Sequence, residues 1–244
     1  MKNEFAVNAS GLLTGRRLGF EPRAGRKVAI TLPPESFVSP VVGDVIVYGW
    51  HSPTVGSEIR AISVDSGCDL LLLRLPDAVR SALLDRSGGA LYVHAVAAAD
   101  RRDLGVTRHE LATGHRDLVV GPLPSSEVFG PTFATELRWS VDGEALAVQS
   151  CGMSACRTRV LDVTTGVLSS YEGSGHGALV GVTADRLYVF DRCHWSPCRV
   201  LAIDLDSGVA SEIAEEAFSA SLVTEAGRQV LRIDTAAGRQ EVTP

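Results

Sequence analysis

The chain has 244 residues, of which 45% are apolar and 21% are charged, and its formal net charge is −6. This composition excludes disorder over most of the chain, because disorder requires low hydrophobicity together with high charge. No apolar run approaches the roughly 18–20 residues that cross a bilayer, so no membrane span is expected. The acidic balance argues against a nucleic-acid partner, which would require a basic face.

A short turn pattern recurs along the chain and predicts the fold. In each copy an acidic or polar residue stands four positions before a glycine and follows apolar residues. A carboxylate can accept backbone N–H bonds across a tight turn, and glycine readily adopts the positive φ that such a turn needs. Ser63 replaces the acidic residue in the second copy. The glycines, in chain order, are Gly25, Gly67, Gly114, Gly166, Gly208 and Gly238.

Short strands are expected on both sides of these turns, because the segments are rich in Val, Leu and aromatic residues and are bounded by Gly, Pro, Asp and Ser. The expected strands before the turns include 44–50, 90–97, 145–149 and 186–190, and those after the turns are 27–32, 69–75, 116–120, 167–171 and 209–213. Four short strands in each unit of roughly 40–50 residues are typical of a β-propeller blade.

We therefore predict an all-β fold, a single six-bladed β-propeller of four-stranded antiparallel blades that spans residues 1–244. The stretch before the first glycine and the last interval between glycines are too short for four strands. The first and last blades are thus expected to be incomplete, and five blades plus an extra hairpin is the alternative. The approximate blades are 1–32, 33–75, 76–123, 124–172, 173–214 and 215–244.

One segment carries a sharper motif. Residues 137–148 contain a Trp-Ser-x-Asp-Gly turn, from Trp139 to Gly143, which is followed by a Leu-Ala-Val strand. This segment resembles the blade motif of TolB-like, WD-repeat-like bacterial propellers, with Val141 in place of the usual proline. The resemblance implies the fold but no particular activity, since propellers serve as binding modules, as peptidase-associated domains and as enzymes.

The predicted topology divides the loops between two faces. If the strands of a blade are named A to D from the channel outward, A–B and C–D turns share one face, while B–C hairpins and D–A connections share the other. The irregular loops, which contain aromatic residues and histidine, are expected on the B–C face, where function usually resides in loops on a rigid frame. The candidate ligand-face residues are Trp50, His51, His176, His194 and Trp195.

Four of the five cysteines form two pairs with equal spacing, Cys151 with Cys156 and Cys193 with Cys198. Both pairs flank predicted B–C hairpins, where facing positions can satisfy disulfide geometry. We predict two hairpin disulfides, and free thiols or a zinc site are the alternatives. Disulfides would indicate export to an oxidising compartment. The remaining Cys68 is expected to be a small buried residue.

The search for chemistry motifs predicts no catalytic residue, metal ligand or cofactor. Residues 173–178 approximate a dinucleotide-binding fingerprint, but a strand-like segment follows where that motif needs a helix. His109 and Glu110 begin a zinc-helix pattern within a predicted strand. Arg101, Arg102 and Asp103 are interpreted as a solvated hairpin tip, and Asp162, Asp204 and Asp234 as turn caps.

The function that fits these observations is a non-catalytic, monomeric binding module that recognises a protein, glycan or small ligand through the B–C loop face. One alternative is a hydrolase-like or lyase-like enzyme with its site in the central funnel. The other is a propeller domain of a larger sensor or peptidase-associated protein. The expected location is secreted, periplasmic or at the cell surface. Because no apolar leader follows Met1, the chain is expected to be a mature or trimmed form.

Overall fold

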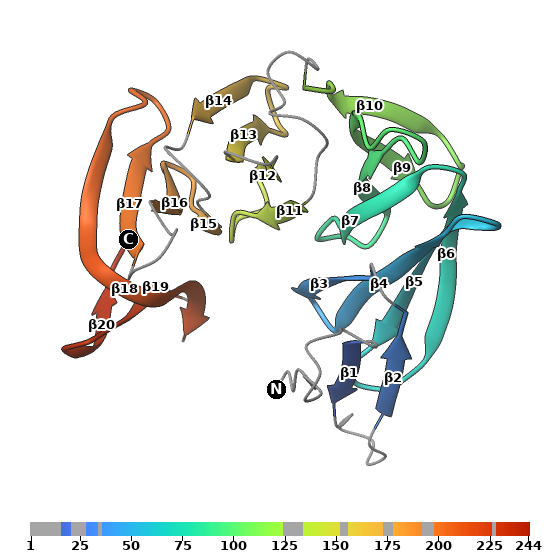
Figure 1. Ribbon diagram of the computed structural model, residues 1–244, viewed down its shortest axis with the longest axis horizontal. Coiled ribbons are helices and arrows are strands. Elements are labelled where there is room, and N and C mark those ends of the chain that lie inside the picture. Colours follow the sequence, from blue (N-terminus) through green and yellow to red (C-terminus); the bar gives the residue numbers. More distant parts are fainter. Residues whose placement is uncertain are drawn as a thin grey trace. The chain divides into compact units, whose positions relative to one another are not determined.

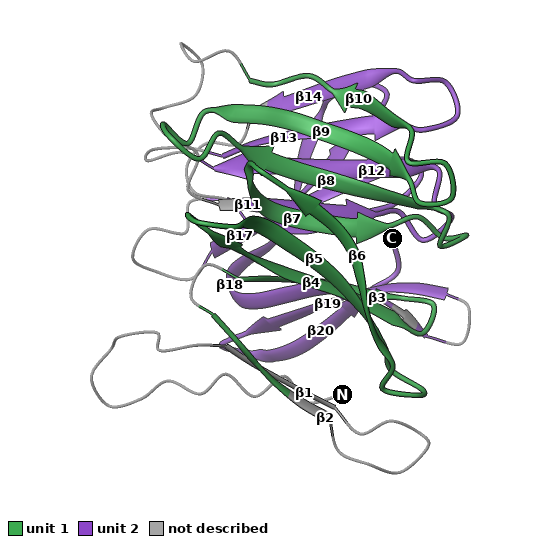
Figure 2. Ribbon diagram, turned by 90° about the vertical axis from the view of Figure 1, so that its right-hand side faces the viewer, with its two compact units in different colours: residues 1–123 green, residues 124–244 purple. Residues whose placement is uncertain are grey.

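A computed structural model of the chain describes residues 16–20, 28–33, 36–123, 134–151, 156–172, 178–191, 198–225 and 228–244. These residues form an all-β structure of antiparallel sheets (Figure 1). The chain divides into two compact units, residues 1–123 and 124–244 (Figure 2), and each is described by itself.

The described residues of unit 1 form one two-stranded hairpin and two four-stranded sheets. The hairpin pairs β1 (Arg16–Phe20) with β2 (Val28–Leu32). The first sheet has the order β3 (Phe37–Val42), β4 (Val45–Ser52), β5 (Gly56–Ser63) and β6 (Asp69–Leu75). The second has the order β7 (Ala78–Leu84), β8 (Ala90–Val96), β9 (Asp103–Glu110) and β10 (Arg116–Val120). Each sheet follows the chain without a crossover, as expected for a propeller blade.

The part of unit 2 that the structure describes forms one four-stranded and one six-stranded sheet. The four-stranded sheet has the order β11 (Ala134–Trp139), β12 (Ala145–Cys151), β13 (Cys156–Asp162) and β14 (Leu168–Glu172). The other sheet contains β15 (Leu179–Val182), β16 (Arg186–Asp191), β17 (Cys198–Asp204), β18 (Ala210–Glu225), β19 (Arg228–Thr235) and β20 (Gly238–Val242).

Strand β18 joins two sets of strands. Its first part, from Ala210, pairs with β17, and its second part, up to Glu225, pairs with β19. Between them Glu216 has a φ of 55°, which is rare for a residue with a side chain. The expected boundary between blades 173–214 and 215–244 thus falls inside a continuous strand, next to this bend.

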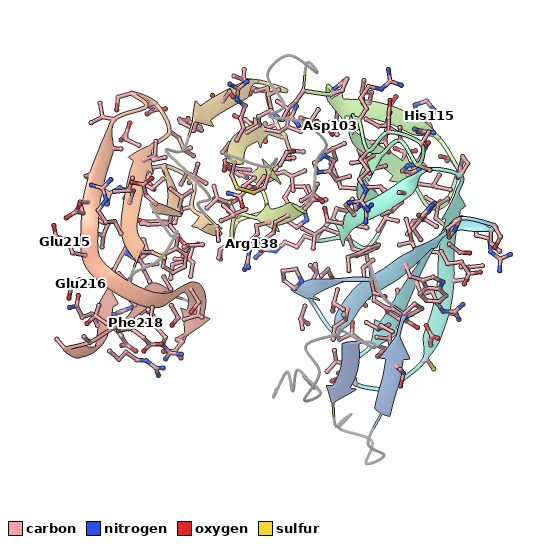
Figure 3. All side chains as sticks on the ribbon, viewed as in Figure 1. Asp103, His115, Arg138, Glu215, Glu216 and Phe218 are labelled. Atoms are coloured by element: carbon pink, nitrogen blue, oxygen red, sulfur yellow. A yellow bond between two sulfur atoms is a disulfide. The ribbon has the colours of Figure 1, made fainter. Side chains whose placement is uncertain are left out.

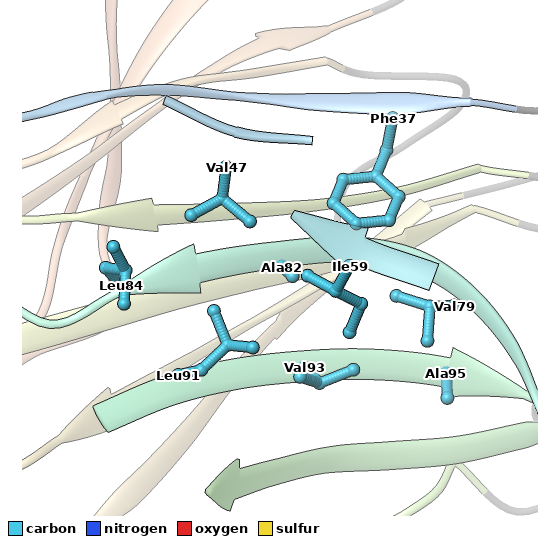
Figure 4. Close-up of a cluster of buried hydrophobic side chains, with 9 residues drawn as sticks. All are labelled: Phe37, Val47, Ile59, Val79, Ala82, Leu84, Leu91, Val93 and Ala95. Atoms are coloured by element: carbon cyan, nitrogen blue, oxygen red, sulfur yellow. The ribbon is translucent and has the colours of Figure 1, made fainter. Parts of the chain in front are cut away.

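Facing sheets bury their alternating apolar side chains against each other. In unit 1 the sheets β3–β6 and β7–β10 enclose one cluster, shown in Figure 4, whose members are Phe37, Val47, Ile59, Val79, Ala82, Leu84, Leu91, Val93 and Ala95. Ile59, Val79, Leu91 and Val93 are fully buried. In unit 2 a corresponding cluster joins β12 and β13 to β15, β16 and β17. Each blade is therefore held by its neighbour as well as by its own hydrogen bonds.

Asp162 and Asp204 accept backbone N–H groups across their turns, as predicted, whereas the first copy, with Gly25, lies outside the described residues. Oδ1 of Asp162 accepts the N–H groups of Thr164 and Thr165 at 2.8 and 2.9 Å, and Gly166 has a φ of 74°. Ser63 supports its turn with Oγ, which accepts the N–H of Ser66. Asp234 is different, because its carboxylate bonds the side chains of Ser219 and Arg239 instead of turn amides.

Candidate functional site

The B–C end of each blade was the predicted position of the site. Taking A to D as the order of strands in each sheet, the B–C hairpins join β4 to β5 and β8 to β9 in unit 1, and β12 to β13 and β16 to β17 in unit 2. The turn from Trp139 to Gly143 joins β11 to β12 and is an A–B turn, as predicted. Antiparallel pairing places each B–C hairpin at the end of its blade from which the D–A connection leaves.

A disulfide closes the β12–β13 hairpin. Cys151 and Cys156 face each other in the strand register, their Cα atoms are 4.0 Å apart and their sulfurs are bonded. This confirms the first predicted bridge. Cys198 is also disulfide-bonded, whereas Cys193 lies outside the described residues.

The prediction for Cys68 is wrong, because this residue is an exposed free thiol. It stands between Gly67 and the first residue of β6, the outermost strand of its blade, and no other described strand pairs with β6 on that side.

Of the predicted ligand-face residues, Trp50 and His51 are described, and His176, His194 and Trp195 lie outside the described residues. Trp50 is half-buried and packs against the cluster formed by Leu32, Ile46, Tyr48 and Ile62. Its ring centroid is 6.3 Å from that of Tyr48. Trp50 therefore serves at least to pack the β4–β5 hairpin against the core.

His51 is held by Ser57, which faces it across the β4–β5 hairpin. The buried hydroxyl of Ser57 donates to the Asp77 carbonyl at 2.7 Å and accepts the Val79 N–H at 2.9 Å. Nδ1 of His51 is 3.1 Å from the same Oγ. Because the single hydroxyl proton goes to Asp77, His51 must donate from Nδ1. In the neutral ring Nε2 is then an acceptor, and the side chain is half-exposed.

The next blade has a buried charged residue at the same end. Asp103, labelled in Figure 3, is 1% exposed, although the sequence analysis interpreted it as part of a solvated tip. Its Oδ1 lies 2.8 Å from Nε2 of His94 and accepts the N–H of Gly105, and its Oδ2 accepts the N–H of Leu123 at 2.8 Å. A carboxylate with this many hydrogen-bond donors can be buried, whereas the sequence shows only the charged neighbours of Asp103.

The contacts of Asp103 also set its ionisation. Burial alone would raise the pKa of the carboxyl group. The hydrogen bond and the charge of His94, together with the amides of Leu123 and Gly105, outweigh this and lower the pKa to about 2. Asp103 is therefore a carboxylate throughout the neutral range. Nδ1 of His94 is buried and has no hydrogen-bond partner among the residues that the structure describes.

A third blade repeats the connection with an amide. Oε1 of Gln149 accepts the N–H of Leu179, the first residue of β15, at 3.1 Å, and Nε2 of Gln149 donates to Thr158. Ser57, Asp103 and Gln149 thus perform one task in three blades. Each is a buried side chain near the B–C hairpin that binds backbone groups of the following D–A connection or of the next blade. We call these three residues the connector anchors.

The connector anchors were not predicted from the sequence. Their residue types differ, and they occupy strand C in two blades and strand B in the third, so no shared motif marks them. The only signal was a polar residue in an otherwise apolar strand, as with Gln149 in Ala-Leu-Ala-Val-Gln.

A small, partly open pocket lies among the described residues of unit 2. It has a volume of about 10 Å³, which is room for roughly one water molecule, and the residues that line it include Gln149, Cys156, Thr158 and Tyr171. Among the described residues, no group of three or more His, Cys, Asp or Glu side chains could hold a metal ion. No helix in the described part of the chain is long and apolar enough to cross a membrane.

No protein-family model matches the chain, and neither does any curated protein. Solved structures do match. TolB from Acinetobacter baumannii has a TM-score of 0.55 at 14% identity, over 93% of this chain and 63% of that chain. The β-propeller domain of the trilobed protease from Pyrococcus furiosus has a TM-score of 0.56 at 9% identity, over 85% of this chain and 70% of that domain. The tricorn protease has a TM-score of 0.57 at 10% identity, over 94% of this chain and 27% of that chain.

These likenesses show that the chain has a TolB-like β-propeller fold, as the blade motif implied. The chain spans less than two thirds of the length of the Acinetobacter TolB and about a quarter of the tricorn protease. At such low identities the likeness concerns the fold alone.

Proposed function

We propose that the chain is an exported, non-catalytic propeller that binds a protein, glycan or small ligand through the B–C ends of its blades. The observation that carries the proposal is the way in which these ends are fastened. In three blades a connector anchor binds the D–A connection or the first strand of the next blade, and a disulfide closes one B–C hairpin. Loops fixed before binding lose little entropy when a ligand arrives, which favours affinity.

His51 is the binding residue that the described geometry favours most. Its Nδ1–H is committed to Ser57, so that Nε2 is presented as an acceptor on a half-exposed ring. A ligand group with a hydrogen-bond donor, such as a sugar hydroxyl or a peptide N–H, suits this atom. Ser57 fixes the ring orientation, because its own hydroxyl is held by Asp77 and Val79.

Export is supported by the Cys151–Cys156 disulfide, since such bonds persist in oxidising compartments and are rare in the cytosol. The second predicted bridge, Cys193–Cys198, belongs to the same proposal. Peptide mapping of non-reduced protein tests both links. Recovery of Cys151 and Cys156 as free thiols from protein made in its native host would contradict export.

The binding proposal is tested with the wild-type chain and two histidine variants. The wild type is screened against an immobilised glycan library and a library of extracellular proteins. Any ligand found is then titrated against His51→Ala and against His115→Ala, a change in the exposed C–D turn at the opposite end of its blade. We expect His51→Ala to weaken binding at least tenfold and His115→Ala to leave it unchanged. Equal affinity for all three proteins would refute the role of His51.

A second function is favoured by one feature of the comparisons. The chain aligns over 89% of its length with 36% of a prolyl endopeptidase chain, and over 94% of its length with 27% of the tricorn protease. The alternative is therefore a propeller domain that works beside a peptidase domain of a larger protein. Extension of the reading frame distinguishes the two, because a catalytic domain in the same frame would favour the alternative.

A further inference from the structure

Strand β6 exposes an apolar edge in unit 1. Its sequence is Asp-Leu-Leu-Leu-Leu-Arg-Leu, and among the described strands it pairs only with β5. Leu70 is 64% exposed and Leu71 is 41% exposed. An outer strand also presents unpaired backbone N–H and C=O groups, which makes such an edge a template for another strand.

The edge of β6 differs from those of the other four-stranded sheets. Strand β6 has seven residues, and all but Asp69 and Arg74 are leucine. The outer strands β10 and β14 have five residues each and include the polar runs Arg-Asp and Ser-Ser. A long apolar edge is the kind that natural sheets usually shorten or interrupt with charges.

The strand is held firmly from inside the blade. Leu72, Leu73 and Leu75 pack against the buried cluster between the two sheets of unit 1. At one end Asp69 pairs with Arg60 at 3.1 Å, and at the other Arg74 pairs with Glu58 at 2.6 Å. The exposed leucines therefore belong to a strand that is fastened on its inner side, although its register with β5 shifts beside Leu71.

The charges of this edge indicate what covers it. The outermost strand has an acid at its beginning and a base at its end, and each is backed by the opposite charge on β5. If two copies aligned β6 in parallel, Asp69 would meet Asp69 and Arg74 would meet Arg74. In an antiparallel alignment, Asp69 of each copy approaches Arg74 of the other. Across the two copies the charges then alternate at each end of the pairing, from Arg60 and Asp69 of one copy to Arg74 and Glu58 of the other. Opposite charges across strands stabilise pairing, whereas like charges oppose it.

We propose that β6 is a self-association surface, where two copies of this chain pair their β6 strands antiparallel about a two-fold axis. Such an interface is isologous, since the same surface serves both copies. It places Leu70 and Leu71, one on each face of the sheet, beside the second copy's strand and extends two blades into one continuous sheet. The inference does not depend on ligand binding at the B–C ends. It runs against the sequence-based prediction of a monomer, which the structure does not test.

The first experiment measures the mass of the chain in solution by light scattering after size-exclusion chromatography, from low to high micromolar protein. A Cys68→Ser background prevents cross-linking through the exposed thiol. We expect the apparent mass to double as the concentration rises, and Leu71→Lys to remove this increase. Leu118→Lys, at an exposed leucine on the edge strand β10, is the matched control and should still dimerise. A monomer at every concentration would overturn the proposal and would mean that the charges and the register shift of β6 protect its edge.

A second experiment tests the antiparallel arrangement. Asp69→Arg alone places like charges at both ends of the pairing, and Arg74→Asp alone does the same with the opposite sign. We expect each variant to be monomeric by itself and their equimolar mixture to form a heterodimer, identified by native mass spectrometry. Circular dichroism must show that both variants are folded. Dimers of either folded variant alone, or a mixture that stays monomeric while the wild type dimerises, would refute the antiparallel pairing.

Discussion

Nε2 of His94 lies 2.8 Å from Oδ1 of Asp103, and neither side chain is exposed to solvent. The pair connects strands β8 and β9 near their shared hairpin, and Oδ2 of the same carboxylate holds the N–H of Leu123. These partners stabilise the buried charge. Removing one of the groups leaves the others buried without a partner, which destabilises the folded state.

Replacing Asp103 should therefore destabilise the protein strongly. Asp103→Ala leaves the Leu123 and Gly105 amides and the His94 ring without their acceptor, and we expect a loss of about 3 kcal/mol in the free energy of unfolding. Asp117→Ala is the matched control, because Asp117 pairs with His115 at 3.0 Å in the same sheet but is exposed. Exposed pairs contribute about 0–1 kcal/mol. Urea unfolding at pH 7 measures both changes, and similar losses for the two variants would contradict this account.

The same carboxylate predicts a pH dependence. Its pKa is about 2 in the folded chain, below the ordinary value of 3.8. Its contribution to stability is therefore fully present above about pH 4 and is lost as the pH falls toward 2. A depression of this size corresponds to about 2 kcal/mol. We expect the stability of the wild type to fall more steeply between pH 4 and pH 2 than that of Asp103→Asn, which cannot titrate there. Parallel curves from urea unfolding would show that Asp103 does not cause the difference.

The sequence predicted the regular part of this structure well. The turn from Asp162 to Gly166 depends on residue types with a strong local preference, and the carboxylate and the glycine behave as their chemistry requires. The same holds for the facing positions of Cys151 and Cys156, because a four-residue hairpin loop fixes their register. The number of blades stays a prediction, since β18 continues through the expected last boundary.

The connector anchors could not be predicted because their roles depend on partners distant in sequence. Asp103 stands beside two arginines and resembles any charged hairpin tip, yet its carboxylate binds an amide 20 residues away. Ser57 similarly reaches Val79 in the next blade. The error at Cys68 has a related cause, since burial of that position depends on whether a further strand covers β6. Local sequence patterns predict turns and strands, whereas the burial and hydrogen bonds of these residues depend on which blade packs against them.

The disulfide should stabilise its hairpin measurably. The bond between Cys151 and Cys156 closes a very short loop, for which chain entropy predicts about 2 kcal/mol. We expect the Cys151→Ser, Cys156→Ser double variant to lose about this amount in urea unfolding, and Cys68→Ser, at an exposed free thiol, to lose nothing. A double variant as stable as the wild type would show that the strand pairing alone holds the hairpin.

Two glycines have nearly the same positive φ but different surroundings. Replacing each by alanine therefore distinguishes the cost of backbone strain from the cost of a steric clash. Gly105 and Gly114 have φ of 77° and 72°. A Cβ on Gly105 would lie 2.2 Å from the Val120 carbonyl oxygen, whereas a Cβ on Gly114 would meet nothing within 4 Å.

Alanine in the left-handed region costs about 1–2 kcal/mol, and we expect Gly114→Ala to lose only that much. Gly105→Ala should lose a further 1–3 kcal/mol or so, because the backbone must move away from strand β10. That movement also pulls on the Gly105 amide, which donates to Asp103. Urea unfolding of the two variants measures the difference, and equal losses would mean that strands β9 and β10 are less closely packed at Gly105 than this structure has them.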